Sequence, residues 1–190
     1  MGQYRQIVVG SILGIFLLAG CGQPTPSDKQ SQRKAIDDMA STTVEKLIEK
    51  NKGLDKEIEN SLGYMVVNWK MIKVPVVGAG KANGVVIDKS SNKHTYVKIS
   101  RFDVGVGWGV RHFKSLVIIN DPKVMAKAKK GTWIFDGGGE GTAGKATADV
   151  SASDIDAKKK GYKAYILMDG GASITASLRA MHLKKDSKLN

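Results

Sequence analysis

Apolar residues recur at helical spacing in the first third of the chain. Their spacing of three and four positions, with charged side chains between them, predicts an amphipathic helix that ends near Gly53. Leu54, Ile58 and Leu62 predict a second, shorter helix. Such a stripe is typical of a packing face, and a membrane-lying face is the alternative. The apolar positions of the first helix are Ile36, Met39, Ala40, Val44, Leu47 and Ile48.

After the second predicted helix the apolar period changes to two, which is the period of a β-strand. The clearest stretch is 102–110, FDVGVGWGV, where five apolar side chains share one face and Asp103 shares the other with three glycines. A row of glycines in a strand predicts a close approach by a packed helix, a second sheet or a ligand. The other predicted strands are 64–69, 74–80, 84–88, 95–100 and 115–119, with a hairpin turn at 90–93.

Three further signals complete the predicted fold. The run 116–119 is apolar on both faces and predicts a central strand, and an Asp-Pro cap predicts a short helix over 122–130. Asp169-Gly170-Gly171 predicts the turn of a final hairpin. Together these patterns predict an α+β domain, a mainly antiparallel β-sandwich or barrel with N-terminal helices and one short internal helix.

The glycine-rich stretch 136–147, DGGGEGTAGKAT, resembles a phosphate-binding loop. Gly139, Gly144 and Lys145 fit the spacing G-x-x-x-x-G-K of that loop. Ala146 stands where the loop needs a hydroxyl for Mg²⁺. The residues that follow alternate as in a strand, whereas a phosphate-binding loop runs into a helix. We therefore interpret the stretch as a connector and not as a nucleotide site.

The N-terminus has the layout of a bacterial lipoprotein signal. Arg5 precedes an apolar run at 7–19, which is short for a membrane span and ends in Leu-Ala-Gly-Cys21. This ending resembles a lipobox, which implies cleavage before Cys21 and its acylation; an ordinary signal peptide or a short anchor helix is the alternative. Gly22 replaces the Asp that retains lipoproteins in the inner membrane, which implies an anchor on the periplasmic face of the outer membrane. The predicted organisation is a signal peptide at 1–20, the lipidated cysteine and a flexible tether at 21–34, and one domain at 35–190.

The chain is strongly basic, with a formal net charge of +12 at pH 7. A basic protein suggests a nucleic-acid partner. The predicted export signal argues against nucleic acid and favours anionic phospholipid headgroups at a membrane surface. A basic surface that only maintains solubility is the alternative. The lysines predicted to contact headgroups are Lys127, Lys129, Lys130, Lys158, Lys159 and Lys160.

No arrangement of residues in the sequence requires an enzyme. His94, His112 and His182 are separated in the sequence and lie in no metal-binding spacing. Cys21 is the only cysteine, so the mature domain has no disulfide, zinc cluster or cysteine nucleophile. Around Ser173 the motif G-x-S-x-G lacks its last glycine. We predict no catalytic residue, no cofactor and no metal site.

Several segments together resemble the SYLF-domain family of lipid-binding domains. The resemblance runs from about residue 42 to residue 190 and rests on the order and spacing of glycine and aliphatic motifs. It implies binding of anionic phospholipid and leaves the protein partner and the oligomeric state open. The alternative is a structural or protein-interaction module of the cell envelope, which docks a protein partner or another copy of itself on the glycine face of Gly105, Gly107 and Gly109. The segments are SLGYMVVNW (61–69), VGAGKANGVVID (77–88), VGVGWGVRHFKSLVIINDP (104–122), GTWIF (131–135) and KAYILMDGGASITASL (163–178).

The substitution Cys21→Ser tests the predicted anchor. It removes the only group that a lipobox would acylate. Buried acyl chains contribute about 0.8 kcal/mol per CH₂, which basic residues alone do not match at physiological salt. We expect the variant in the soluble periplasmic fraction, and the wild-type chain in the membrane fraction with incorporated radiolabelled palmitate. A wild-type chain without label would contradict both the lipoprotein assignment and the outer-membrane location.

Overall fold

The structure is a computed structural model that describes residues 26–135, 139–142 and 161–190. Several predictions lie outside these residues. They concern the signal peptide and lipidation site Cys21, the strand expected after the glycine-rich stretch, and the lysines Lys158, Lys159 and Lys160.

Two helices open the described chain, and both form where the apolar spacing predicts them. Helix α1 is Pro26–Lys50 and helix α2 is Leu54–Glu59. Gly53 joins them with a φ of 86°, a left-handed conformation that glycine adopts without strain. α1 begins inside the segment expected to be a flexible tether. Arg33 Nε donates to the Leu189 carbonyl oxygen at 2.6 Å, which holds this part of α1 against the C-terminus.

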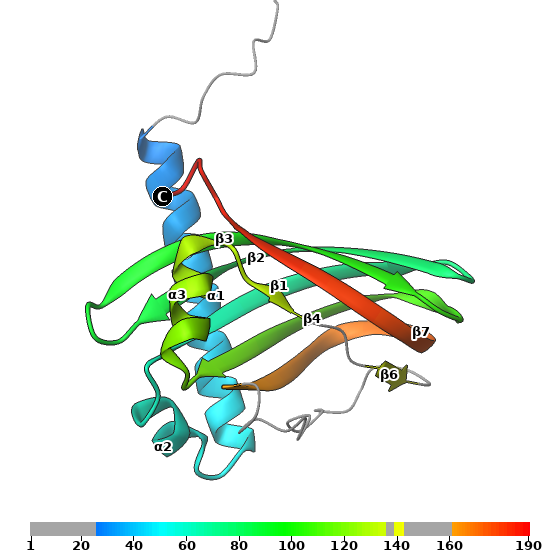
Figure 1. Cartoon of the computed structure of the whole chain (residues 1–190), viewed down its shortest axis with the longest axis horizontal. Helices are drawn as coiled ribbons and strands as arrows, with labels where there is room; N and C mark the ends of the chain where they lie inside the picture. The colour runs from blue at the N-terminus through cyan, green and yellow to red at the C-terminus, as the bar shows by residue number, and fades with distance from the viewer. Residues whose placement is uncertain (1–25, 136–138, 143–160) are drawn as a thin grey trace, which may run out of the picture.

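Seven strands form one antiparallel sheet (Figure 1). They are β1 Gly63–Lys73, β2 Val77–Asp88, β3 Lys93–Val104, β4 Gly107–Ile119, β5 Ile134–Phe135, β6 Gly139–Thr142 and β7 Tyr162–Lys185. Their order across the sheet is β3-β2-β1-β4-β7-β5, and β6 pairs with β7. The hairpin turn predicted at 90–93 joins β2 to β3. The two strands predicted at 74–80 and 84–88 form the single strand β2.

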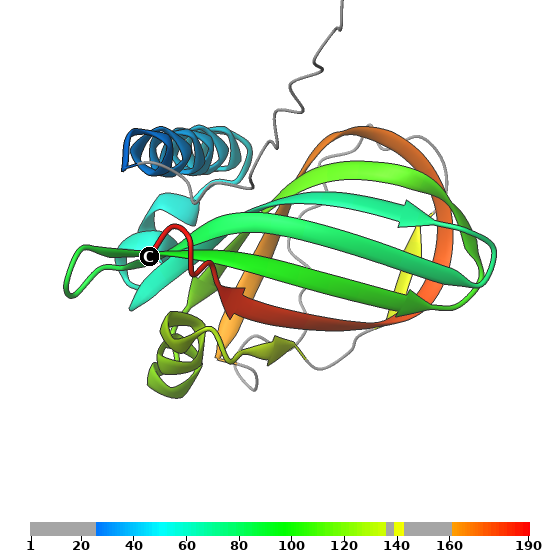
Figure 2. The ribbon, with the colours of Figure 1, turned by 90° about the horizontal axis from the view of Figure 1, so that it is seen from above.

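A two-residue link between β3 and β4 curls the sheet. These strands lie on opposite sides of the β1–β2 hairpin, yet only Gly105 and Val106 connect them. In a flat sheet the two strands would be three spacings of about 4.8 Å apart. The three Cα steps of about 3.8 Å across the link cannot span that distance. The sheet therefore bends around the hairpin, as Figure 2 shows.

The link corrects the prediction of one continuous strand over 102–110. Gly105 has a φ of 143°, which residues with a side chain rarely adopt, and the chain turns there at the end of β3. The N–H groups of Gly105 and Gly107 donate to the carbonyl oxygens of Val76 and Pro75 at 2.9 and 3.1 Å. These bonds join the β3–β4 link to the tip of the β1–β2 hairpin.

The C-terminal strand is one long strand and not the predicted hairpin. β7 pairs with β4 through residues 162–175 and with β3 through residues 178–185. The pairing register shifts between His112 and Phe113, and Asp169 is the extra residue on β7. The Asp-Gly-Gly stretch therefore makes a β-bulge in place of a turn. A bulge bends a strand and increases its twist, which lets β7 follow the curl of the sheet.

The short internal helix α3, Pro122–Lys130, forms as predicted. The Asp121 side chain accepts hydrogen bonds from the backbone N–H groups of Lys123 and Val124 at 2.7 and 2.9 Å, as expected of a helix cap. Gly131 ends the helix with a φ of 73°. The predicted α+β class with a mainly antiparallel sheet is thus confirmed. The finer choice of a sandwich or a barrel stays a prediction.

Two apolar clusters hold these elements together. One fills the inner face of the curled sheet around Val67 and Trp69, and the other lies between α1 and the outer face around Leu47. The run 116–119 contributes alternate side chains to the two clusters, which confirms it as a central strand. The apolar stripe of α1 is therefore a packing face. Among the described residues, the two clusters begin at Ile36.

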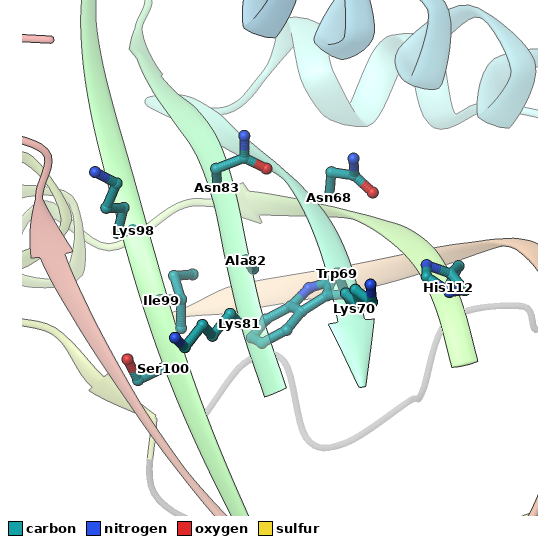
Figure 3. A pocket seen from close by; sticks show the side chains of 10 residues that line it. All are labelled: Asn68, Trp69, Lys70, Lys81, Ala82, Asn83, Lys98, Ile99, Ser100 and His112. Carbon is teal, nitrogen blue, oxygen red and sulfur yellow. The ribbon is translucent and has the colours of Figure 1, made fainter. Parts of the chain in front are cut away.

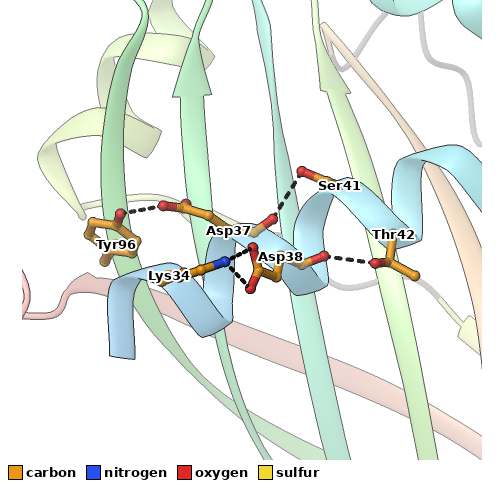
Figure 4. Close-up of polar contacts among 6 residues, drawn as sticks. All are labelled: Lys34, Asp37, Asp38, Ser41, Thr42 and Tyr96. Carbon is orange, nitrogen blue, oxygen red and sulfur yellow. Dashed lines mark hydrogen bonds and ion pairs between the residues drawn. The ribbon is translucent and has the colours of Figure 1, made fainter. Parts of the chain in front are cut away.

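Polar contacts fix α1 on the outer face of the sheet (Figure 4). Asp37 accepts a hydrogen bond from the Tyr96 hydroxyl at 2.8 Å and lies 3.0 Å from Nδ1 of His94, so one carboxylate contacts two side chains of β3. Burial, followed by the hydrogen bond to Asp37, raises the pKa of Tyr96 to about 12. The neighbouring Asp38 is exposed and pairs with Lys34 within α1 at 2.7 Å.

The variants Asp37→Ala and Asp38→Ala compare these two contacts on one helix. We expect Asp37→Ala to lower the free energy of unfolding by about 1–3 kcal/mol, because it leaves the buried Tyr96 hydroxyl without its acceptor. Asp38→Ala removes an exposed pair that contributes about 0.5 kcal/mol or less. Urea unfolding followed by circular dichroism measures both losses. Equal losses would show that the Asp37 contact does not hold α1.

Candidate functional site

Polar side chains cross the outer face of the sheet beyond the part that α1 covers (Figure 3). In the strand register Lys70 lies opposite Lys81 on one side and His112 on the other. One row nearer to α1, Asn68 lies opposite Asn83. With Trp69, Ala82 and Ile99, the exposed side chains line an open depression of about 590 Å³ over four strands. We name the exposed group the lysine band: Asn68, Lys70, Lys81, Asn83, Lys98, Ser100 and His112.

The lysine band has an unbalanced positive charge. It contains no carboxylate, and Lys98 pairs with the buried Asp186 beside it at 2.9 Å. Lys70 and Lys81 stand directly opposite each other, and like charges in this position destabilise a sheet. No ion pair joins either lysine to a residue that the structure describes. A bound anion would relieve the repulsion, and ammonium and amide N–H groups are suitable donors to phosphate oxygens.

Beyond the lysine band, at the end of the sheet that holds the β1–β2 hairpin tip and the β3–β4 link, the outer face is apolar and exposed. Val106 is 76% exposed, Trp108 70% and Phe102 54%. Scattered exposed apolar residues are normal on a protein, whereas a contiguous group at one end marks a contact surface. Ile72 follows Lys70 on the same face of β1, so band and apolar residues occupy successive rows. We name this group the apolar belt: Ile72, Val74, Val76, Val77, Phe102, Val104, Val106, Trp108 and Val110.

The inner face at the same end of the sheet is charged. Arg101 donates from Nε and Nη2 to the two carboxylate oxygens of Asp103 at 2.6 and 2.7 Å, and both side chains are buried. Lys73 and Arg111 are buried here as well. In the described part of the chain, Lys73 Nζ has no hydrogen-bond partner. This end of the sheet is therefore polar inside and apolar outside.

The alternation predicted for 102–110 is present, but its apolar face is the one that meets solvent. Asp103 and the glycines face inward. Gly107 is buried, and Gly105 and Gly109 are half-buried. The glycine face lies inside the curled sheet and offers little exposed surface on which a protein partner could dock.

The predicted headgroup lysines of α3 do not join the lysine band. Lys127 and Lys130 are exposed, but Lys129 forms an ion pair with Asp88 at the end of β2. The hydrogen bond from Lys129, and then one from Ser90, hold the pKa of Asp88 well below its usual range. α3 lies at the end of the sheet away from the β1–β2 hairpin tip (Figures 1 and 2), so its lysines and the band form separate surfaces.

The three histidines occupy separate environments. His94 contacts Asp37, His112 belongs to the lysine band, and His182 is exposed on β7. Among the described residues no group of three or more His, Cys, Asp or Glu side chains is placed to hold a metal ion. The geometry at this face suits binding of an anion through lysine and amide groups.

Sequence reasoning missed the lysine band because the predicted strands were too short. Lys70 falls after the strand predicted at 64–69, and Lys81 falls in the gap between two predicted strands. Lys70 and Lys81 lie opposite each other only because of the β1–β2 register, which pairs residues that are distant in the sequence. A sequence signal was present in the apolar period of two, which continues through Trp69 and Met71 on either side of Lys70.

Comparison with known proteins identifies no family for the chain. The chain matches no family model and no curated protein sequence. The similarity to SYLF domains therefore stays a prediction. Within the described ranges, the helices are too short or too polar to cross a membrane.

The substitution Lys129→Gln tests whether this lysine is structural. We expect it to lower the free energy of unfolding by about 1–3 kcal/mol at pH 7, because the buried Asp88 carboxylate loses its charged partner. A lowered pKa stabilises the folded state above the pKa of an unfolded Asp, near 4, and this stabilisation is lost as the pH falls. The difference from wild type should therefore shrink below about pH 4.

Lys127→Gln is the matched control, because Lys127 is exposed on the same helix. Urea unfolding between pH 3 and pH 7 measures both variants. Equal stability of the two variants at pH 7 would contradict a structural role for Lys129.

Proposed function

We propose that this chain is a non-enzymatic lipoprotein of the outer membrane, whose SYLF-like domain binds anionic phospholipid through the lysine band. The observation that supports this most directly is the pair of exposed lysines Lys70 and Lys81, which face each other without a carboxylate in the band. An arrangement that costs stability in the free protein becomes favourable when an anion lies between the charges.

The surroundings of the pair suit a phosphate headgroup. Neighbouring strands lie about 4.8 Å apart, so both ammonium groups can reach one phosphate. Asn68 and Asn83 lie one row away and provide amide N–H donors. Each lysine near an anionic surface contributes roughly 1 kcal/mol, and salt weakens this attraction.

The predicted lipid anchor and the basic surfaces of the domain have separate roles in this function. The anchor at Cys21 supplies lasting attachment, while the lysine band selects anionic lipid. The exposed Lys127 and Lys130 act as a separate, weaker basic surface. Nucleic acid is not the expected polyanion outside the cytoplasm. The pairing of β7 with both β4 and β3 is compatible with the barrel that we propose as the finer architecture of the sheet.

The double variant Lys70→Gln/Lys81→Gln tests the lysine band. The chain from residue 22 is mixed with vesicles of phosphatidylglycerol or of phosphatidylcholine and sedimented. We expect the double variant to bind the anionic vesicles about tenfold to thirtyfold more weakly than the parent chain, which corresponds to two lysines at roughly 1 kcal/mol each. Neutral vesicles should bind the parent chain weakly, and 0.5 M salt should reduce its binding to anionic vesicles.

The matched control is Lys46→Gln/Lys52→Gln, which removes the same charge from exposed positions outside the band. Its binding should stay close to that of the parent chain. An equal loss of vesicle binding in both double variants would show that binding depends only on net charge. It would contradict a specific role for the band. Absence of binding to anionic vesicles would contradict the proposed function itself.

A further inference from the structure

We propose that the apolar belt inserts into the lipid bilayer whose headgroups the lysine band contacts. This inference rests on the proposed function and adds the depth and orientation of binding. The belt and the band are successive rows of one face, with Ile72 beyond Lys70 on β1 and Phe102 beyond Ser100 on β3. A bilayer presents the same order of layers, with acyl chains beneath charged headgroups.

The polarity of the sheet changes along its strands, which supports a lipid contact at the tips. Around Trp69 apolar side chains fill the inside, whereas at the tips Lys73 and the Arg101–Asp103 pair lie inside and Trp108 lies outside. Apolar outside and polar inside is the pattern of strands whose outer face contacts lipid. In water the same pattern leaves apolar side chains exposed to solvent, which is unfavourable.

Backbone N–H groups at this end of the sheet form hydrogen bonds within the protein, as contact with lipid requires. A backbone N–H group without a hydrogen-bond partner is strongly unfavourable in lipid. The Val74 N–H donates to the Val77 carbonyl oxygen at 3.0 Å, and the N–H groups of Gly105 and Gly107 donate to the β1–β2 hairpin. These bonds tie the hairpin tip and the β3–β4 link into one unit.

The length of the belt limits how deeply it inserts. On β3 it includes Phe102 and Val104, which are two residues apart and therefore about 7 Å apart along the strand. This length is close to the depth of about 5–10 Å at which interfacial segments lie between headgroups and acyl chains. It is far less than the thickness of the bilayer core, about 30 Å. Insertion at this end leaves α1, at the other end of the sheet, on the side that faces away from the bilayer (Figures 1 and 2).

The charges beside the belt favour a bilayer over a second copy of the chain. A symmetric contact between two belts would bring the two lysine bands close together, and like charges disfavour this contact. An anionic membrane surface would instead place phosphate groups beside Lys70 and Lys81. The exposed Trp108 fits the same surface, because indole rings favour the membrane interface.

The three tryptophans of the chain allow a direct test. Trp69 and Trp133 are buried at 5% and 4% exposure, so a fluorescence change on vesicle binding reports Trp108. The chain from residue 22 is mixed with phosphatidylglycerol vesicles whose acyl chains are brominated near the headgroup or near the methyl end. We expect a blue shift and strong quenching by the shallow bromines, weak quenching by the deep ones, and loss of both effects in Trp108→Phe.

A second measurement compares belt variants by sedimentation with phosphatidylglycerol vesicles. Phe102→Ser/Val106→Ser should weaken binding tenfold or more, although both positions are exposed and contribute little to the core. Leu62→Ser is the control, because Leu62 is also exposed, at 40%, but lies outside the belt. Equal weakening by the control would overturn the proposal.

The outcomes separate insertion from the proposed function. Binding that depends on Lys70 and Lys81 without quenching of Trp108 would overturn insertion and leave phospholipid binding in place. Failure to bind vesicles would overturn both. Self-association in analytical ultracentrifugation that is lost in Phe102→Ser/Val106→Ser, with Trp108 unquenched by lipid, would assign the belt to a contact between copies and overturn the proposal.

Discussion

The link of Gly105 and Val106 between β3 and β4 determines the shape of the sheet. Two residues must pass over the β1–β2 hairpin, so the four strands cannot lie flat. The bend requires a positive φ at Gly105, which a residue with a side chain would adopt only under strain. β7 follows the bend through the bulge at Asp169 and pairs with β4 and then β3. The positions of the lysine band and the apolar belt both follow from this curl.

The curled sheet has an outer face with two different ends. At one end α1 covers the apolar side chains, and the contacts of Asp37 fix it there. At the other end no described element covers the belt, and the charged side chains lie inside. Burying Arg101 and Asp103 is costly unless they are paired, and their two hydrogen bonds offset part of that cost. The arrangement suits a surface that meets lipid at one end only.

The lysines show that charge alone does not assign a role. Lys129 belongs to a basic run in the sequence, yet it pairs with Asp88 and holds α3 to the sheet. Lys70 and Lys81 belong to no run, yet the register places them opposite each other on the outer face. Lys73 is buried on the inner face. In each case the neighbouring residues, which the fold supplies, decide between a structural contact and an exposed binding group.

Local signals in the sequence determined the helices and most strands. Apolar spacing predicted α1 and α2, and the Asp121 cap with Gly131 predicted α3, because helix formation depends on residues a few positions apart. The sequence also showed the alternation of 102–110. It did not show which face meets solvent, because alternation is symmetric until another element covers one side. Only the tertiary structure decided this, by packing α1 over one end of the sheet and leaving Trp108 uncovered at the other. It likewise decided the Lys70–Lys81 pair, since strand register is a relation between residues that sequence spacing does not fix.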